Sequence, residues 1–262
     1  MADRVTVDGQ TLTPDNVATV AYDHTPVELS PTAREGIGLA RQRIETLLES
    51  EEPIYGVTTG FGRLVEERID ADDRHRLQRN LLRSHAAGVG DPLEVPVVRA
   101  MLLTRANALA KGFSGVRPVV VEGLIGLLNA GVHPIVPRRG SLGASGDLAP
   151  LAHLSLVLIG EGRAIVDGEE VDGQAALDAA GLEPIELEAK EGLALINGTQ
   201  LTLAIAALAV VHGRRLLDAA DTAGALTTEV TLSTTANCDP GIAAVRSPTS
   251  RTGYGTTAWR RT

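Results

Sequence analysis

Apolar residues recur at three- and four-residue steps along much of the chain, which is the spacing of amphipathic helices. The clearest stripe consists of Ala33, Ile37, Ala40, Ile44 and Leu47. Ser30-Pro31 precedes it, and this pair predicts a helix start with Ser30 as N-cap. Similar patterns predict helices over residues 72–86, 96–111 and 118–131. The sequence therefore predicts a mainly α protein.

A proline-free stretch from Thr199 to about Thr234 predicts one long helix of roughly 50 Å. Its first half, Leu201–Val211, is apolar on every face, so other residues or other subunits must cover it all round. This apolar run is shorter than the ~18–20 residues of a membrane span, so we expect no membrane segment.

Strand patterns are sparse, and only one stands out. Arg163–Val166 and Glu169–Val171 flank Asp167-Gly168, a pair that supplies the positive φ of a tight turn. The sequence predicts one small β-hairpin here.

Composition excludes several classes of function. The 262 residues carry a net charge of −9 and only 2% aromatic residues, so we expect no nucleic-acid or anionic membrane partner. Cys238 is the only cysteine, and the five histidines other than His85 show no metal-ligand spacing, so we expect no disulfide framework and no metal site. Met1-Ala2-Asp3-Arg4 has no apolar signal core, and we expect a cytoplasmic protein.

The glycine-rich segment Gly140–Pro150 runs directly into an apolar helix, with Asp147 as the expected N-cap. An anion cradle is disfavoured, because the segment has no Gly-Lys-Ser/Thr and Asp147 places a negative charge where phosphate would bind. Two interpretations remain. One is a tight turn that uses small residues for close packing.

The other interpretation is chemical. The Gly146 amide nitrogen could attack the Ala144 carbonyl, and loss of two waters, one from the Ser145 hydroxyl, would give a ring with an exocyclic methylidene. Glycine suits the attacking position because it accepts strained φ/ψ, and serine supplies the hydroxyl that is eliminated. Such a ring is an electrophile that no ordinary side chain offers.

Four segments, in order, resemble the aromatic amino acid ammonia-lyase family. Gly140–Ala152 resembles its prosthetic-group signature, and Tyr55–Gly62 resembles its Tyr-Gly-x-Asn-Thr-Gly-Phe-Gly motif, with Thr58 in place of asparagine. Leu77–Gly90 is similar to its substrate-selectivity helix, and Lys190–Gln200 to its asparagine loop. The resemblance ceases near Arg246 and implies the N-terminal half of longer relatives.

The resemblance assigns roles to particular residues. Ala144, Ser145 and Gly146 would form a methylidene-imidazolone with no external cofactor, and Tyr55 would be a catalytic acid/base; its alternative is a packed ring with a bonded hydroxyl. His85 would bind substrate, and Ser84-His85 is similar to the histidine-specific members; its alternative is a helix-end histidine that interacts with the dipole.

Asn197 would orient the substrate amine or the ring, with a helix-terminating Asn-Gly turn as its alternative. The implied fold is the N-terminal portion of the family's helical bundle, and the implied reaction is elimination of ammonia from L-histidine to give urocanate, in a homotetramer. The rivals are a phenylalanine or tyrosine lyase or aminomutase, and an inert helical fragment.

The resemblance also divides the chain. Residues 1–196 would form an N-terminal domain that carries the prosthetic-group loop, and residues 197–246 would begin the central bundle of long helices. Residues 247–262 contain no acidic residue and no Val, Ile or Leu, and we interpret them as an unrelated tail from a frameshift or truncation, the alternative being a disordered tail.

Overall fold

The computed structural model describes residues 4–49, 74–142, 146–236 and 239–245. Its internal contacts divide the chain into two compact units, Met1–Leu208 and Ala209–Thr262. The first unit extends beyond residue 196 into the long helix, and the expected domain division after that residue stays a prediction.

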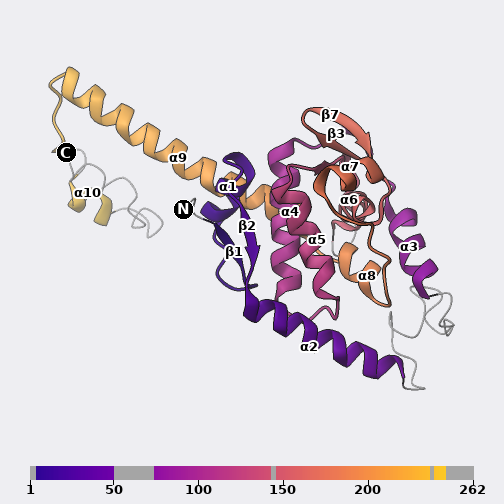
Figure 1. The fold of residues 1–262 in the computed structure, drawn as a ribbon. Coiled ribbons are helices and arrows are strands. Elements are labelled where there is room, and N and C mark those ends of the chain that lie inside the picture. The colour runs from indigo at the N-terminus through magenta and orange to yellow at the C-terminus, as the bar shows by residue number, and fades with distance from the viewer. Residues whose placement is uncertain (1–3, 50–73, 143–145, 237–238, 246–262) are drawn as a thin grey trace. The chain divides into compact units, whose positions relative to one another are not determined.

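Helices make up most of the described residues, and short strands join them (Figure 1). The helices are α1 (Pro14–Tyr22), α2 (Pro31–Leu48), α3 (Arg74–His85), α4 (Val95–Ala110), α5 (Pro118–Asn129), α6 (Leu148–Leu156), α7 (Gly173–Ala180), α8 (Glu191–Ile196), α9 (Gln200–Val230) and α10 (Pro240–Ala244), with a 3₁₀ turn at Val157–Ile159. The strands are β1 (Val5–Val7), β2 (Val27–Leu29), β3 (Val89–Pro92), β4 (His133–Pro134), β5 (Pro137–Arg139), β6 (Arg163–Val166) and β7 (Glu169–Asp172). The predicted mainly α class is confirmed.

The core of the first unit forms around α4. This helix is buried from Val98 to Arg105 without interruption, and α1, α2 and α5 pack against it. Figure 1 shows α4 and α5 side by side. A helix that is apolar nearly all round is stable in water only inside such a layer of neighbours.

The predicted hairpin is present. β6 and β7 pair antiparallel with Val166 opposite Glu169, and Asp167 and Gly168 take φ values of 50° and 87° in the turn. β6 also pairs with β4, which makes a three-stranded sheet. The pairs β1–β2, parallel, and β3–β5, antiparallel, were not predicted, because strands of so few residues carry no readable alternation.

Two details of the helix predictions are corrected. Ser30 occupies the N-cap position of α2, but its side chain makes no capping hydrogen bond. The long helix ends at Val230 and not near Thr234. The hydroxyls of Thr227, Thr228 and Thr231 each bond the carbonyl four residues earlier, a local competition that weakens a helix end.

Helix α1 was missed, although its sequence carries a start signal. Thr13 and Asn16 form a capping box, in which each side chain accepts from the other residue's backbone N–H, and Pro14 follows the N-cap. The helix is short, so its start signal is stronger than its apolar periodicity.

The segment Glu191–Val230 is long and apolar enough to cross a membrane by length and composition alone. The sequence prediction of no membrane segment rested only on the apolar run that ends at Val211. Half of its most apolar window is buried inside the structure, and the core helix of a soluble protein passes the same test.

His133, in β4, is a buried histidine whose Nδ1 has no hydrogen-bond partner among the described residues. Burial lowers its pKa to about 4, and the nearby charges of Arg99 and His24 act in the same direction. Because this pKa lies below the ordinary value of 6.5, protonation favours the unfolded chain.

We therefore expect the variant His133→Asn to lose less stability on acidification than the wild type. The contribution of neutral His133 is fully present above pH ~6.5 and is lost as the pH falls toward ~4, by at most ~3 kcal/mol. Urea unfolding at about pH 7.5, 5.5 and 4.5 measures the difference. His212→Asn, at an exposed position of α9, is the control and should follow the wild type. Parallel curves for His133→Asn and wild type would contradict the assignment.

Candidate active site

The described part of the chain contains three of the six predicted site residues, namely His85, Gly146 and Asn197. Tyr55, Ala144 and Ser145 lie outside the described residues, as does Thr58. His85 ends α3, Gly146 precedes α6 and Asn197 follows α8, and these helices pack pairwise against one another. The elements that carry the predicted residues are therefore neighbours in the fold.

Gly146 has the backbone conformation of a sharp turn. Its φ is 87°, in the left-handed region that favours glycine, and its carbonyl accepts a hydrogen bond from the Leu142 N–H at 2.6 Å. This bond joins the two described ends of the glycine-rich loop. The sequence requirement for glycine at this position is thus explained by the backbone.

Asp147 holds this loop to the start of α9. Its fully buried carboxylate accepts from the Thr202 backbone N–H at 2.8 Å, the Ser141 hydroxyl at 2.9 Å and the Thr202 hydroxyl at 3.2 Å. Thr202 lies in the first turn of α9, where N–H groups lack partners within the helix. The prediction that Asp147 caps α6 with its side chain is wrong, because the carboxylate binds the N-terminus of α9 instead.

His85 is half-buried at the C-terminal end of α3. Its Nδ1 lies 2.9 Å from the Leu81 carbonyl oxygen, and 3.2 Å from the Ser84 hydroxyl. A carbonyl can only accept, so Nδ1 carries the proton. In the neutral ring this leaves Nε2 as an acceptor, and Nε2 has no partner in the described part of the chain.

Two contacts fix the residues that follow His85: β3 pairs with β5, which precedes the glycine-rich loop, and Gly88 bonds to α6, which follows it. β3 pairs with β5, with Val89 opposite Arg139, and the Gly88 N–H donates to His153 Nε2 at 3.0 Å. A Cβ at Gly88 would lie 3.1 Å from that same nitrogen, so the chains approach closely. Burial lowers the pKa of His153, which favours the neutral ring that can accept this bond. His153 is thus a structural histidine.

Asn197 is an exposed residue at the C-cap of α8, with its backbone N–H bonded to the Leu193 carbonyl. The start of α8 is bound to α3 through Gln78, whose buried side-chain oxygen accepts from the Gly192 N–H at 2.9 Å. A Cβ at Gly192 would lie 2.7 Å from the Gln78 carbonyl oxygen, so only glycine fits here. The helix that carries His85 and the helix that ends at Asn197 are therefore directly bonded.

An ion pair with a buried carboxylate fixes the other side of α8. The Glu191 carboxylate is fully buried and accepts from the Arg117 side chain at 2.7 and 2.9 Å and from the Glu188 N–H at 2.9 Å. Hydrogen bonding to Glu191 raises the pKa of Arg117. The ion pair between Arg117 and Glu191 thus fixes the start of the segment Lys190–Gln200, which contains Asn197.

Sequence reasoning missed the residues that hold the site together. Gln78, Ser141 and Thr202 lie inside recognisable segments, but their polar side chains carry no pattern that identifies a distant partner. The one usable signal was polarity in an apolar context, as at Thr202 in the apolar start of α9.

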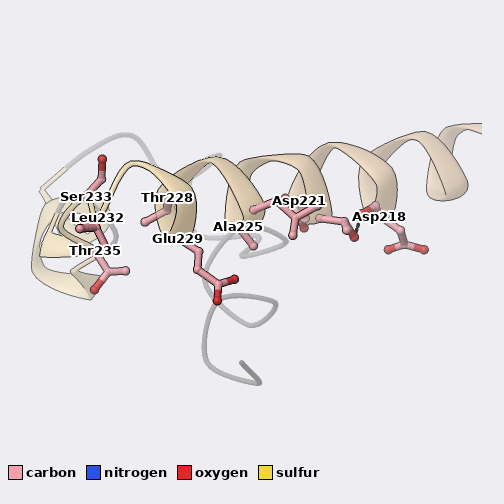
Figure 2. Close-up of a pocket in the computed structure, with 10 residues that line it drawn as sticks. Asp218, Asp221, Ala225, Thr228, Glu229, Leu232, Ser233 and Thr235 are labelled. Carbon is pink, nitrogen blue, oxygen red and sulfur yellow. Dashed lines mark hydrogen bonds between the residues drawn. The ribbon is translucent and has the colours of Figure 1, made fainter.

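A further hollow lies away from these helices. A hollow of about 890 Å³ in the second unit is lined by one face of α9 and the turn that follows, including Asp218, Asp221 and Glu229 (Figure 2). It contains none of the predicted site residues, and its carboxylates would repel the carboxylate of an amino acid. We therefore base the candidate site on α3, α6 and α8.

Comparison with known proteins identifies the family of the chain. The family model of the aromatic amino acid lyases matches residues 12–253. A protein of Halobacterium salinarum described as "Probable histidine ammonia-lyase" is 61% identical over 242 residues, which cover 92% of this chain and 46% of that protein. The chain thus spans about half the length of the curated relatives it matches.

Solved structures share the fold. Histidine ammonia-lyase from Trypanosoma cruzi superposes with a TM-score of 0.85 and 40% identity over 93% of this chain and 49% of that one. Pantoea agglomerans phenylalanine aminomutase gives a TM-score of 0.87 and 32% identity over 98% of this chain and 49% of that one. The fold, the family model and the sequence identity lead to one conclusion: the chain belongs to the aromatic amino acid lyase family.

Proposed function

We propose that this protein eliminates ammonia from L-histidine to give urocanate, the first step of histidine degradation, in the cytoplasm. The observation that carries the choice of substrate is His85, at the end of α3, with its Nδ1 bonded to the Leu81 carbonyl. The curated relatives named as histidine ammonia-lyases support the same substrate.

His85 would recognise the imidazole of the substrate. With Nδ1 donating to Leu81, the neutral ring offers Nε2 as an acceptor, which can pair with an imidazole N–H. A phenyl ring has no such donor, and the phenol hydroxyl of tyrosine lies farther from the ring centre. The fixed tautomer of His85 therefore favours histidine over phenylalanine.

Residues 144–146 fit the family's prosthetic group at the one position that is described. Gly146 has a φ of 87° and lies next to the buried Asp147, which holds the loop to α9. Ala144, Ser145 and Gly146 would hold the methylidene-imidazolone as part of their own backbone. When formed, the group supplies an electrophile for the substrate amine. Asn197 would orient that amine through its side-chain amide, and Tyr55 would act as the acid/base for the proton.

We further propose that the protein works as a homo-oligomer, as a tetramer in its full-length form. In the second unit, α9 exposes large apolar side chains, with Leu216 72% and Val230 82% accessible. Apolar surface of this kind on a long helix is typical of a face that another chain covers.

The rivals predict different products. The fold does not separate the first rival from a histidine lyase. The solved structure of Pantoea agglomerans phenylalanine aminomutase has the same fold as this chain. An inert helical fragment would release no product at all. Supplying histidine, phenylalanine and tyrosine in parallel to the protein, alone and co-expressed with the remaining half of the Halobacterium salinarum relative, separates them. We expect urocanate from histidine. Cinnamate from phenylalanine, 4-hydroxycinnamate from tyrosine, or a β-amino acid from either favours the first rival, and no product in either form favours the second.

Formation of the prosthetic group should be visible in the mass of the protein. We expect the intact mass to fall below the encoded mass by two water molecules, with the loss confined to the peptide that contains Ala144-Ser145-Gly146. Ser145→Ala removes the hydroxyl that is eliminated and should restore the encoded mass, whereas Ser141→Ala, in the same loop, should retain the loss. An unmodified tripeptide in catalytically active protein would contradict the assignment of the prosthetic group to these three residues.

The substrate role of His85 can be tested against a second histidine of the same helix. His85→Leu should lower kcat/KM for histidine by roughly ten- to a hundredfold, the effect of leaving a buried polar group of the substrate unpaired. His75 also lies on α3 and has its Nδ1 2.9 Å from a carbonyl, that of Leu187. His75→Leu should therefore lower thermal stability without changing the preference for histidine over phenylalanine. Equal losses of histidine turnover in the two variants would make His85 a structural residue.

A further inference from the structure

Helix α4 carries two arginines whose side chains are buried in the core of the first unit. Arg99 is 1% exposed and Arg105 is 3% exposed, and neither forms an ion pair with a carboxylate within the described residues. A buried charge without a counter-ion is costly unless hydrogen bonds surround it. The partners of the two guanidinium groups therefore indicate what each one does.

Arg99 binds two helix ends. Its Nε donates to the Val20 carbonyl at 2.9 Å and its Nη1 to the Leu128 carbonyl at 3.0 Å, near the C-termini of α1 and α5. Carbonyls at a helix C-terminus carry partial negative charge and favour a cation. Arg99 thus joins α1 and α5 to α4, and none of its partners lies in the turn between α8 and α9.

Arg105 binds the turn between α8 and α9. Its Nη2 donates to the Asn197 carbonyl at 3.1 Å, and its Nη1 to the Gln200 side-chain oxygen at 2.7 Å, while Nε has no partner in the part of the chain that the structure describes. Burial lowers the pKa of Arg105 to about 10, so the group is still charged at neutral pH. One charged, planar group therefore spans the turn on both sides of Gly198.

The contact with Arg105 explains why residue 198 is a glycine. Its backbone does not need positive φ, but a Cβ there would lie 2.4 Å from Arg105 Nη1 and 2.1 Å from the Gln200 oxygen. The guanidinium and the amide therefore fill the space that a side chain would take. The turn therefore packs directly against the Arg105 side chain.

We propose that Arg105 is a positioning residue that fixes Asn197 for substrate. It holds the backbone carbonyl of Asn197, a residue that stays exposed, so it sets the direction of the side-chain amide without touching substrate. The inference rests on the proposed function, in which Asn197 orients the substrate amine. Lysine cannot replace arginine here, because an ammonium lacks the planar fork that reaches two acceptors across a turn.

Amide hydrogen exchange tests the contact without any assay of activity. Arg105→Lys should speed exchange in the peptide over residues 197–203 by roughly ten- to a hundredfold, the equilibrium effect of losing a charged hydrogen bond. Arg99→Lys is the matched control, since it removes an equally buried arginine from the same helix. It should speed exchange at the ends of α1 and α5 and leave residues 197–203 unchanged.

A second variant keeps the test decisive if Arg105→Lys does not fold. Gln200→Glu gives Arg105 a carboxylate partner at the position of the present 2.7 Å bond, and charge-assisted bonds are stronger than neutral ones. Exchange over residues 197–203 should then become slower. Unchanged exchange there in either variant overturns the positioning role.

A double-mutant cycle on activity distinguishes positioning from general stability. In the form of the protein that turns over histidine, Arg105→Lys should lower kcat by about tenfold or more, with little change in KM. In the Asn197→Ala background the same change should cost almost nothing, because Arg105 acts through Asn197. Additive losses overturn the proposal. Altered exchange in a protein that yields no urocanate leaves the contact standing and instead counts against the proposed function.

Discussion

The buried carboxylate of Asp147 is the interaction on which the arrangement of the candidate site depends. A charge removed from water is tolerated only where donors surround it, and here they come from the first turn of α9 and from the opposite arm of the glycine-rich loop. The residue therefore binds Gly146, which precedes it, to the helix that starts just after Asn197. Loss of the carboxylate would release both at once, because no other described side chain spans them.

The remaining site elements are held mainly by side chains that bond to backbone. Gln78 binds the start of α8, His153 binds Gly88, and Arg105 binds Asn197. A bond of this kind fixes the path of the chain itself, whereas a pair of long side chains fixes only their tips. The helices that carry His85 and Asn197 thus have defined positions relative to each other through their backbones.

Charge pairs at the surface contribute less. Arg79 and Arg83 both bind Glu161 from α3, and although burial opposes ionisation of Glu161, the hydrogen bonds from Arg83 and Arg79 outweigh it and lower its pKa. The arginines are about half exposed, and pairs of this kind are worth only ~0–1 kcal/mol. The buried amide of Gln78 is a second link from α3, made directly to the backbone of α8.

The sequence by itself determined the mainly α class, the positions of α2 to α5, the hairpin at Asp167-Gly168 and the resemblance to a family, because periodicity, turn residues and motif order are local properties. It also singled out Gly146, for which a positive φ is a backbone requirement of that one position. Only the tertiary structure decided that Asp147 serves α9 and not α6, that Gln78 joins α3 to α8, and that Arg105 faces Asn197 while Arg99 does not. Each of these depends on which distant backbone group needs a partner, and a polar side chain within a helix gives the same local pattern whichever partner it finds.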